Sequence, residues 1–145
     1  MLLFENTYKG KTVIITGHTG FKGSWLSTWL LSLGANVIGI SNNIPTSPSN
    51  YKSSNIIQYI DDHRIDICDA TQVQSIIQKY QPDFVFHLAA QALVRTSYDK
   101  PLSTISTNVL GTVNILNALR CLDKNVVAVM ITSDKAYDNV EWVWG

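Results

Sequence analysis

The chain has 145 residues, of which 46% are apolar and 15% are charged, which fits a single folded domain with a hydrophobic core. Eleven basic and eleven acidic side chains cancel without long like-charged runs, which argues against a nucleic-acid partner. No apolar stretch is long enough to span a membrane and the N-terminus lacks the features of a secretion signal, so we expect a cytoplasmic protein. Cys68 and Cys121 lie far apart and the histidines are not clustered, so we expect two reduced thiols and no metal site.

The first predicted strand, residues 12–17, runs directly into a glycine-rich turn. Gly17, Gly20 and Gly23 form a G-x-x-G-x-x-G pattern at the start of a predicted helix, and Gly34 stands where that helix should end. One apolar face of this helix is expected to be buried, and it consists of Trp25, Leu26, Trp29, Leu30 and Leu33. A glycine turn between a strand and a helix favours pyrophosphate binding, because backbone N–H groups approach the ligand there. The alternative is a tight turn without a ligand.

The second predicted strand, residues 36–41, completes a β-α-β unit. In most dinucleotide-binding folds an acidic residue follows this strand and binds the adenosine ribose. Here that position holds Ser41, Asn42 and Asn43. The irregular stretch 42–55 is too long for an ordinary connection, and loops of this length are usually functional or mobile. A short run at residues 64–67 is the predicted third strand.

The next helix begins at Asp69, whose side chain can cap it while Gln72 completes a capping-box pattern. Its buried stripe is expected to be Val73, Ile76, Ile77 and Tyr80. The fourth strand, residues 83–90, precedes a long helix that begins near Pro101, with an apolar stripe of Leu102, Ile105, Val109, Val113, Leu116 and Leu119. The fifth strand is residues 126–133. This order predicts an α/β fold, a Rossmann-like doubly wound parallel sheet with spatial order 3-2-1-4-5, truncated after about the fifth strand.

The stretch "TGHTGFKG", followed by "HLAAQ" and a later "TS", resembles the extended short-chain dehydrogenase/reductase family. The resemblance implies NAD as cofactor, while the charges alone leave NADP open because Lys22 stands in the glycine loop. Asp66 and Ile67 match the family's pair at the adenine edge; a solvated aspartate at a strand end is the alternative. The residues implied to bind the cofactor are Gly17, His18, Thr19, Gly20, Phe21, Lys22, Gly23, Asp66, Ile67, Leu88, Ala89, Ala90, Gln91, Thr107 and Thr132.

Five longer stretches are more specific, namely "GHTGFKGSWL", "HLAAQALVRTSY", "TNVLGT", "TSDKAYDN" and "EWVWG". They look like the CDP-glucose 4,6-dehydratase family, which begins several deoxysugar pathways for bacterial surface polysaccharide. The resemblance implies a lyase that acts on CDP-glucose or a related nucleotide sugar, in which a hydride passes from the sugar to NAD and returns. Small departures are Ala92, where these enzymes commonly have proline, and Ala136, where they commonly have cysteine.

The catalytic residues that this resemblance implies are Ser133, Asp134 and Lys135. Ser133 would hydrogen-bond the reacting C4 hydroxyl, and a protonated Asp134 would act as acid on the departing C6 hydroxyl. Lys135 stands where the related dTDP-glucose enzymes have a glutamate base. A lysine acts as a base only when its pKa is lowered, which an ionised Asp134 would oppose and a protonated one would not. The alternative for this triplet is a polar turn at a strand end.

Three further residues carry smaller expectations. His87 is expected to be a hydrogen-bonded core histidine at a strand end. Arg95 could meet a phosphate of the CDP group, or it could be a surface ion-pair donor. Asn108, next to Thr107, matches a family segment near the cofactor, although polar residues there could simply satisfy backbone groups.

The superfamily's Tyr-x-x-x-Lys pair does not occur in this sequence, since no tyrosine is followed four residues later by lysine. We therefore expect residues 1–145 to be an incomplete NAD-binding Rossmann domain that lacks the C-terminal substrate-binding part and is inactive alone. The resemblance also implies that the full-length protein is a homodimer, through the helix that begins near Pro101 and the helix that bears the missing tyrosine. Competing interpretations are another NAD-dependent nucleotide-sugar epimerase or dehydratase, and a dinucleotide-binding module without catalysis.

Overall fold

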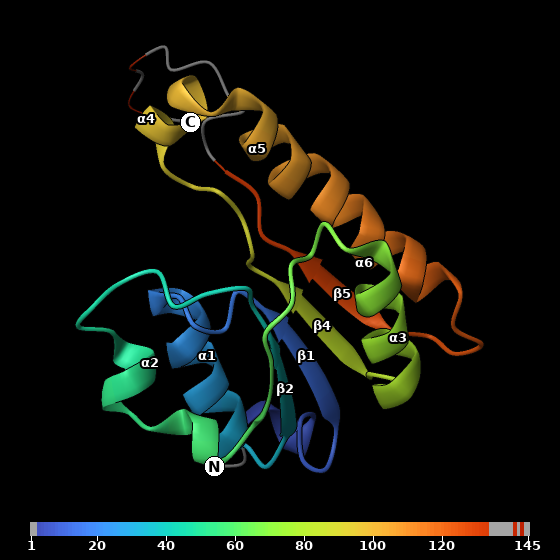
Figure 1. Cartoon of the computed structure of the whole chain (residues 1–145). Coiled ribbons are helices and arrows are strands. Elements are labelled where there is room, and N and C mark those ends of the chain that lie inside the picture. The colour runs from blue at the N-terminus through green and yellow to red at the C-terminus, as the bar shows by residue number, and fades with distance from the viewer. Residues whose placement is uncertain (1–2, 134–140, 142, 144–145) are drawn as a thin grey trace.

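The computed structural model of the chain describes residues 3–133, 141 and 143. They are built on a five-stranded parallel sheet with strand order β3-β2-β1-β4-β5 (Figure 1). The strands are Thr12–Thr16 (β1), Asn36–Ile40 (β2), Asp61–His63 (β3), Phe84–His87 (β4) and Val127–Met130 (β5). The order confirms the doubly wound sheet that the sequence predicts, in which the chain crosses over to both sides of β1.

Helices cover both faces of this sheet (Figure 1). Their bounds are Phe21–Ser32 (α1), Asn50–Ser53 (α2), Ala70–Tyr80 (α3), Val94–Asp99 (α4), Pro101–Ile105 (α5) and Gly111–Arg120 (α6). Short 3-10 helices lie at Leu3–Asn6 (η1) and Ile56–Gln58 (η2), and Ser106–Leu110 (η3) is a π-helical turn that joins α5 to α6 without a break. None of the helices in the described residues is long and apolar enough to cross a membrane.

The core consists of two layers, because alternate residues of β1 point to opposite faces of the sheet. Val13 and Ile15 pack with Leu30 on the α1 face. Ile14 packs on the other face, in a cluster that includes Ile77 of α3 and other apolar residues of α3 and α6. This two-sided burial explains the near-continuous apolar character of the first two strands.

The third strand lies at Asp61–His63 and not at residues 64–67, so that prediction was wrong. The strand pairs with Ile38, Gly39 and Ile40 of β2, and the last bond of this ladder joins Ser41 N–H to His63 C=O at 3.1 Å. The chain of β2 turns away after Ser41, which leaves residues 64–67 without a strand to pair with. Ile65 and Ile67 are still apolar because they pack against the core cluster next to α3 and α6.

Helix α1 buries part of the predicted face, since Leu30 is in the core and Leu26 and Leu33 pack against it, but the two tryptophans of that face are not buried. Its buried residues are Gly23, Ser24, Ser27 and Leu30, whereas Trp25 and Trp29 are each about half exposed, at 56% and 50%. The helix starts so close to β1 that a Cβ atom on Gly23 would lie 2.2 Å from the carbonyl oxygen of Gly17. Only small side chains fit in the first turns, so the tryptophans lie on the outer side.

Helix α3 follows its prediction closely. The Asp69 carboxylate accepts from the N–H of Gln72 at 3.0 Å and from its side-chain amide at 2.6 Å. Val73, Ile76 and Ile77 are buried, as expected. The stripe predicted for the helix that begins at Pro101 is instead mostly exposed, because Gly111, Ile115 and Ala118 face the core in its place.

Candidate functional site

The glycine turn is built from contacts that exclude side chains. Gly17 has φ +73°, in the left-handed region, and a Cβ atom there would lie 2.9 Å from the backbone nitrogen of Ala89. Gly20 is the N-cap of α1, and its N–H donates to Gly17 C=O at 3.0 Å. Gly17 therefore lets the turn touch the chain after β4, and Gly23 lets α1 begin directly against the turn.

The first turn of α1 has the features of an anion-binding site. The first N–H groups of a helix have no intrahelical partner, and the helix dipole makes this end positive. Among the described residues no side chain caps α1 at Gly20, and the hydroxyls of Ser24 and Ser27 donate to the carbonyls of Phe21 and Gly23 at 2.9 and 2.8 Å. The arrangement fits a phosphate or pyrophosphate group.

A cleft of about 910 Å³ opens at the carboxyl ends of the strands, between the glycine turn and residues 88–93. It lies at the switch point between β1 and β4, which is where doubly wound sheets bind their ligands. The cleft brings together most of the predicted site residues: Gly17, Gly20, Phe21, Lys22, Gly23, Leu88, Ala89, Ala90, Gln91, Thr132 and Ser133. Asp134 and Lys135 lie outside the described residues, so the predicted catalytic roles stay predictions.

The other predicted cofactor residues, His18, Thr19, Asp66, Ile67 and Thr107, do not line this cleft. The His18 side chain is fully buried, and its Nε2 bonds the Asp62 carboxylate at 3.0 Å. Its ring lies so close to β2 that a Cβ atom on Gly39 would be 2.5 Å from it. Any contact of His18 with a cofactor would therefore use its backbone.

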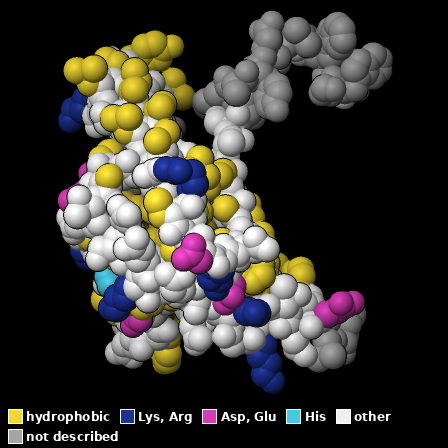
Figure 2. All heavy atoms as spheres, turned by 90° about the vertical axis from the view of Figure 1, so that its right-hand side faces the viewer, with side chains coloured by type: hydrophobic (Ala, Val, Ile, Leu, Met, Phe, Trp, Pro, Cys, Tyr) yellow, Lys and Arg dark blue, Asp and Glu magenta, His cyan; other side chains and the backbone are white. Residues whose placement is uncertain are grey.

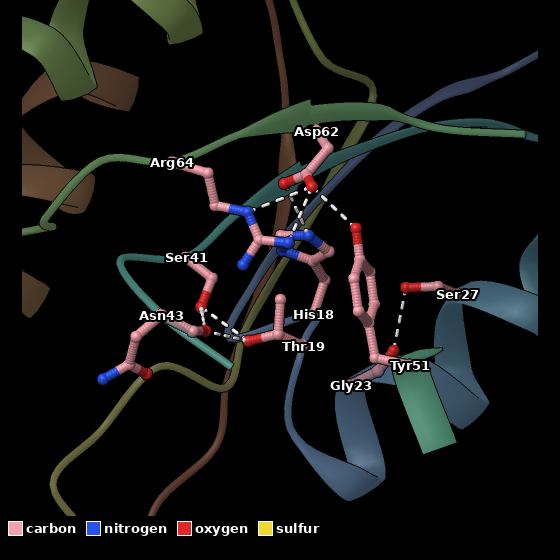
Figure 3. Close-up of polar contacts among 9 residues, drawn as sticks. All are labelled: His18, Thr19, Gly23, Ser27, Ser41, Asn43, Tyr51, Asp62 and Arg64. Atoms are coloured by element: carbon pink, nitrogen blue, oxygen red, sulfur yellow. Dashed lines mark hydrogen bonds and ion pairs between the residues drawn. The ribbon is translucent and has the colours of Figure 1, made fainter. Parts of the chain in front are cut away.

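Asp62 is the centre of a polar cluster that connects His18 to the irregular stretch after β2. Figure 3 shows Tyr51, Arg64 and His18 converging on the Asp62 carboxylate. The Tyr51 hydroxyl donates to it at 2.6 Å, and the Arg64 guanidinium donates at 2.7 and 3.0 Å. Tyr51 belongs to α2, so this cluster fixes part of the stretch for which the sequence predicts no regular structure.

These contacts set the protonation states in the cluster. Burial would raise the pKa of Asp62, but the hydrogen bonds from Tyr51 and Arg64 outweigh it and hold that pKa below its ordinary value. Burial lowers the pKa of His18 despite the nearby Asp62 charge, so the imidazole is neutral near pH 7 and its Nε2–H donates to Asp62. Burial and the neighbouring Asp62 raise the pKa of Tyr51 to about 12.

Ser41 occupies the position of the usual ribose-binding acid, but its hydroxyl faces inward. It lies 2.7 Å from the Thr19 hydroxyl and 3.0 Å from the carbonyl oxygen of Asn43, and only 8% of the residue is exposed (Figure 3). Thr19 also donates to the Asn43 carbonyl at 2.6 Å. The two hydroxyls therefore hold the turn after β2. No carboxylate stands at that position, because the sequence there is Ser41-Asn42-Asn43.

Asp66 and Ile67, which were predicted to contact the adenine, differ in the exposure of their side chains. Asp66 is exposed, its carboxylate accepts from Cys68 N–H at 2.9 Å, and the Asn42 amide approaches it at 3.5 Å. The Ile67 side chain is buried, and its carbonyl accepts from the Asn114 amide at 2.9 Å. Of these two side chains, the Asp66 carboxylate is exposed and the Ile67 side chain is not.

His87 is a buried, fully bonded histidine, as its position at a strand end suggested. Its Nδ1 lies 2.7 Å from the Thr16 hydroxyl and its Nε2 lies 2.9 Å from the Thr112 hydroxyl. Thr112 gives its hydrogen to Asn108 C=O, so it must accept from Nε2–H, and Thr16 then donates to Nδ1. Burial lowers the pKa of His87, which agrees with this neutral tautomer.

Several residues that line the cleft were not predicted as site residues from the sequence. Ser97, Thr104 and Thr112 line the cleft together with apolar Leu93 and Val94. Thr104, Asn108 and Thr112 repeat every four residues, which was a readable signal for one polar face of a helix. Among the described residues there is no group of three or more His, Cys, Asp or Glu side chains that could hold a metal ion.

Known proteins with similar sequences include sugar-nucleotide enzymes. CDP-glucose 4,6-dehydratase of Salmonella typhimurium is 46% identical over 144 residues, which cover 99% of this chain and 40% of that protein. The chain thus spans less than half the length of this relative. CDP-paratose 2-epimerase of Salmonella typhi is 34% identical over 132 residues, which cover 89% of this chain and 38% of that protein.

Solved structures agree with the fold, and the family is shown by sequence. The UDP-glucose 4-epimerase of Thermus thermophilus in complex with NAD matches with a TM-score of 0.67 at 32% identity, covering 75% of this chain and 33% of the epimerase. A match to the GDP-mannose 4,6 dehydratase family covers residues 14–143. Because that match takes in the glycine turn, the residues that line the cleft and nearly the whole sheet, the chain belongs to the GDP-mannose 4,6 dehydratase family.

Proposed function

We propose that this chain is the NAD-binding part of a CDP-glucose 4,6-dehydratase, a lyase that forms CDP-4-keto-6-deoxyglucose for bacterial surface polysaccharide such as O-antigen. The observation that carries the proposal is the cleft that is lined both by the glycine turn and by Ser133, which follows β5. The 46% identity to the Salmonella dehydratase supports the choice of substrate. The NAD-bound epimerase of similar fold supports the choice of cofactor.

The residues of this chain would divide the work between binding and proton transfer. The N-terminus of α1 and the glycine turn would hold the pyrophosphate, and Asp66 would accept from the adenine amino group. Bound NAD would supply reversible hydride acceptance for the sugar, between C4 and C6 of the glucose. Ser133 would hydrogen-bond the C4 hydroxyl, and Asp134 and Lys135 would serve the proton transfers at C5 and C6.

The sugar-binding half of the site belongs, in this proposal, to the rest of a longer protein. The chain spans 40% of the length of the Salmonella dehydratase, and its sequence contains no Tyr-x-x-x-Lys pair. Residues 1–145 would therefore form an incomplete Rossmann domain. A cytosolic location is part of the proposal, and the two free cysteines, Cys68 and Cys121, are consistent with a reducing compartment.

A homodimer of the full-length protein is also proposed, through the helix formed by α5, η3 and α6. Its outer face exposes five large apolar side chains, from Leu102, Ile105, Val109, Val113 and Leu116. Figure 2 shows hydrophobic side chains gathered at the end of the molecule where α4 and α5 lie. A continuous apolar face of this kind is typical of a protein interface.

The proposed activity is tested with the full-length protein. Purified protein is incubated separately with CDP-glucose, UDP-glucose and dTDP-glucose, and the nucleotide sugars are separated and identified by mass. We expect loss of one water from CDP-glucose without net oxidation. Turnover of only UDP-glucose or dTDP-glucose would sink the CDP assignment and favour another nucleotide-sugar enzyme of the same fold.

A further inference from the structure

Residues 88–93, here called the wall segment, face the glycine turn across the cleft and are held largely by side chains. Ala89 N–H donates to the Thr16 hydroxyl at 3.0 Å. Gln91 N–H donates to Asn108 Oδ1 at 2.8 Å, and Asn108 Nδ2 donates back to Gln91 C=O at 3.0 Å. One amide side chain therefore bonds both main-chain polar groups of Gln91.

The Gln91 side chain extends this anchoring along the wall segment. Its Oε1 accepts from Leu93 N–H at 2.8 Å, and its Nε2 donates to Leu93 C=O and to the Thr104 hydroxyl, each at 3.1 Å. The segment is thus folded against the helix at two points, Thr104 and Asn108. Its other end is fixed to β1 through Thr16.

The π-helical turn η3 explains how three polar residues reach the cleft from one helix. Thr104, Asn108 and Thr112 all line the cleft and are spaced by four residues. In a regular α-helix each fourth residue is rotated by about 40°, since a turn takes 3.6 residues. The π-helical turn at Ser106–Leu110 takes more residues per turn, which reduces this drift in the stretch that contains Asn108.

We propose that Asn108 is a positioning residue for the cofactor site, which acts through Gln91 to fix the distance between the wall segment and the glycine turn. The inference rests on the proposed function, because it assumes that the cleft holds a dinucleotide. The tolerance is small: the backbone of Ala89 is so close to Gly17 that no Cβ atom fits between them. A shift of the wall segment would therefore change the space for the cofactor directly.

The first test compares Asn108→Ala with Asn117→Ala in the full-length protein. Asn117 is a matched control because it is an exposed asparagine on the same helix and does not line the cleft. We expect the Kd for NAD, measured by titration calorimetry, to rise about tenfold in Asn108→Ala, since two hydrogen bonds are lost, and to stay unchanged in Asn117→Ala. A Kd in Asn108→Ala within twofold of wild type would overturn the proposal.

A second variant, Asn108→Asp, separates positioning from folding. An ionised aspartate accepts from Gln91 N–H but repels Gln91 C=O, whereas a protonated one donates to that carbonyl as asparagine does. We expect NAD affinity in this variant to improve as pH is lowered, relative to wild type over the same range. The wild-type comparison also accounts for His87, which joins this network through Thr112. A pH profile parallel to that of wild type would contradict the proposal.

These outcomes are distinguishable from failure of the proposed function. If wild-type protein binds NAD but leaves CDP-glucose unchanged, the assignment of the reaction is wrong, while the Kd comparison still decides the role of Asn108. If wild-type protein does not bind NAD, both proposals fail together.

Discussion

Backbone contacts within the protein exclude a side chain at Gly17 and at Gly23, independently of any ligand. The carbonyl of Gly17 occupies the space that a side chain on Gly23 would need, and Gly17 itself lies against Ala89. Gly20 is less constrained, because a Cβ atom there would lie 3.3 Å from Gly17 C=O. The three glycines of one motif therefore differ in what they tolerate.

Gly23→Ala is expected to destabilise the full-length protein by about 2 kcal/mol, because the overpacked backbone at the start of α1 must shift. NAD binding should weaken as well, since the same shift moves the helix N-terminus. Urea unfolding and NAD titration measure the two effects. Gly20→Ala is the control, with a smaller loss expected; equal losses in the two variants would contradict the steric argument.

His18 and His87 make stability depend on pH. Burial lowers the pKa of both side chains in the folded protein, so below about pH 6.5 the unfolded chain binds protons that the folded one does not. Stability is therefore fully present above that pH and is lost as pH falls toward the folded-state pKa values. The slope approaches about 1.4 kcal/mol per pH unit for each histidine.

We expect the free energy of unfolding to fall between pH 7 and pH 5, and to fall less in His87→Gln. The measurement is urea unfolding of the full-length protein at several pH values in this range. His87→Gln will also lower stability at pH 7, because the bonds to Thr16 and Thr112 change, so the slope and not the value is compared. An unchanged slope in the variant would show that His87 does not titrate differently in the two states.

Among the elements, those with local signals were predictable and those with distant partners were not. Helix α3 carries its cap and its stripe in consecutive residues, starting at Asp69. Strand β3 has the sequence Asp-Asp-His, which has no apolar signal; it forms because β2 offers a free edge and because Asp62 finds partners 11 and 44 residues earlier, in Tyr51 and His18. The residues next to β3 in the sequence do not indicate partners that lie so far away along the chain.

The exposed face of the helix formed by α5, η3 and α6 gives a prediction about assembly. Val109→Asp with Val113→Asp places two charges in the centre of the apolar face, which is expected to convert a full-length dimer to monomer. Sedimentation velocity measures the change. Asn117→Asp, on the same helix and already polar, should leave the dimer intact. A dimer that persists in the double variant would place the interface elsewhere.

The candidate site was predictable as far as it depends on backbone turns and strand ends. Gly17 to Gly23 and Leu88 to Gln91 meet in the cleft because parallel strands bring their carboxyl ends to one edge of the sheet. The inward orientation of Ser41 and the full burial of His18 depend on Asn43 and Gly39, which only the folded structure brings next to them. Sequence position alone could not assign their orientation.

For the whole molecule, β5 differs from β1, the strand on the other side of β4. Val127 and Val129 are 54% and 37% exposed, whereas the residues of β1 from Val13 to Thr16 are fully buried. Parallel sheets in proteins of this class are covered on both faces. We therefore expect the remaining part of the full-length protein to cover β5.

The 145-residue chain on its own is expected to leave CDP-glucose unchanged and to bind NAD weakly. In the proposed function the Tyr-x-x-x-Lys pair would come from outside residues 1–145, and Val127 and Val129 of β5 are exposed in this chain. The purified chain is assayed beside the full-length protein for water loss from CDP-glucose and for NAD binding. Dehydration by the shorter chain at a rate near that of the longer one would refute this expectation.

The strand order β3-β2-β1-β4-β5 also has a consequence for synthesis on the ribosome. Strands β1, β2 and β3 can pair as soon as His63 has emerged, but β1 must wait for β4, which begins at Phe84, to cover its second edge. At about 5 to 20 residues per second, this interval lasts roughly one to four seconds. During that time β1, which is buried in the folded protein, has an open edge, and this is the moment when a chaperone would be most useful.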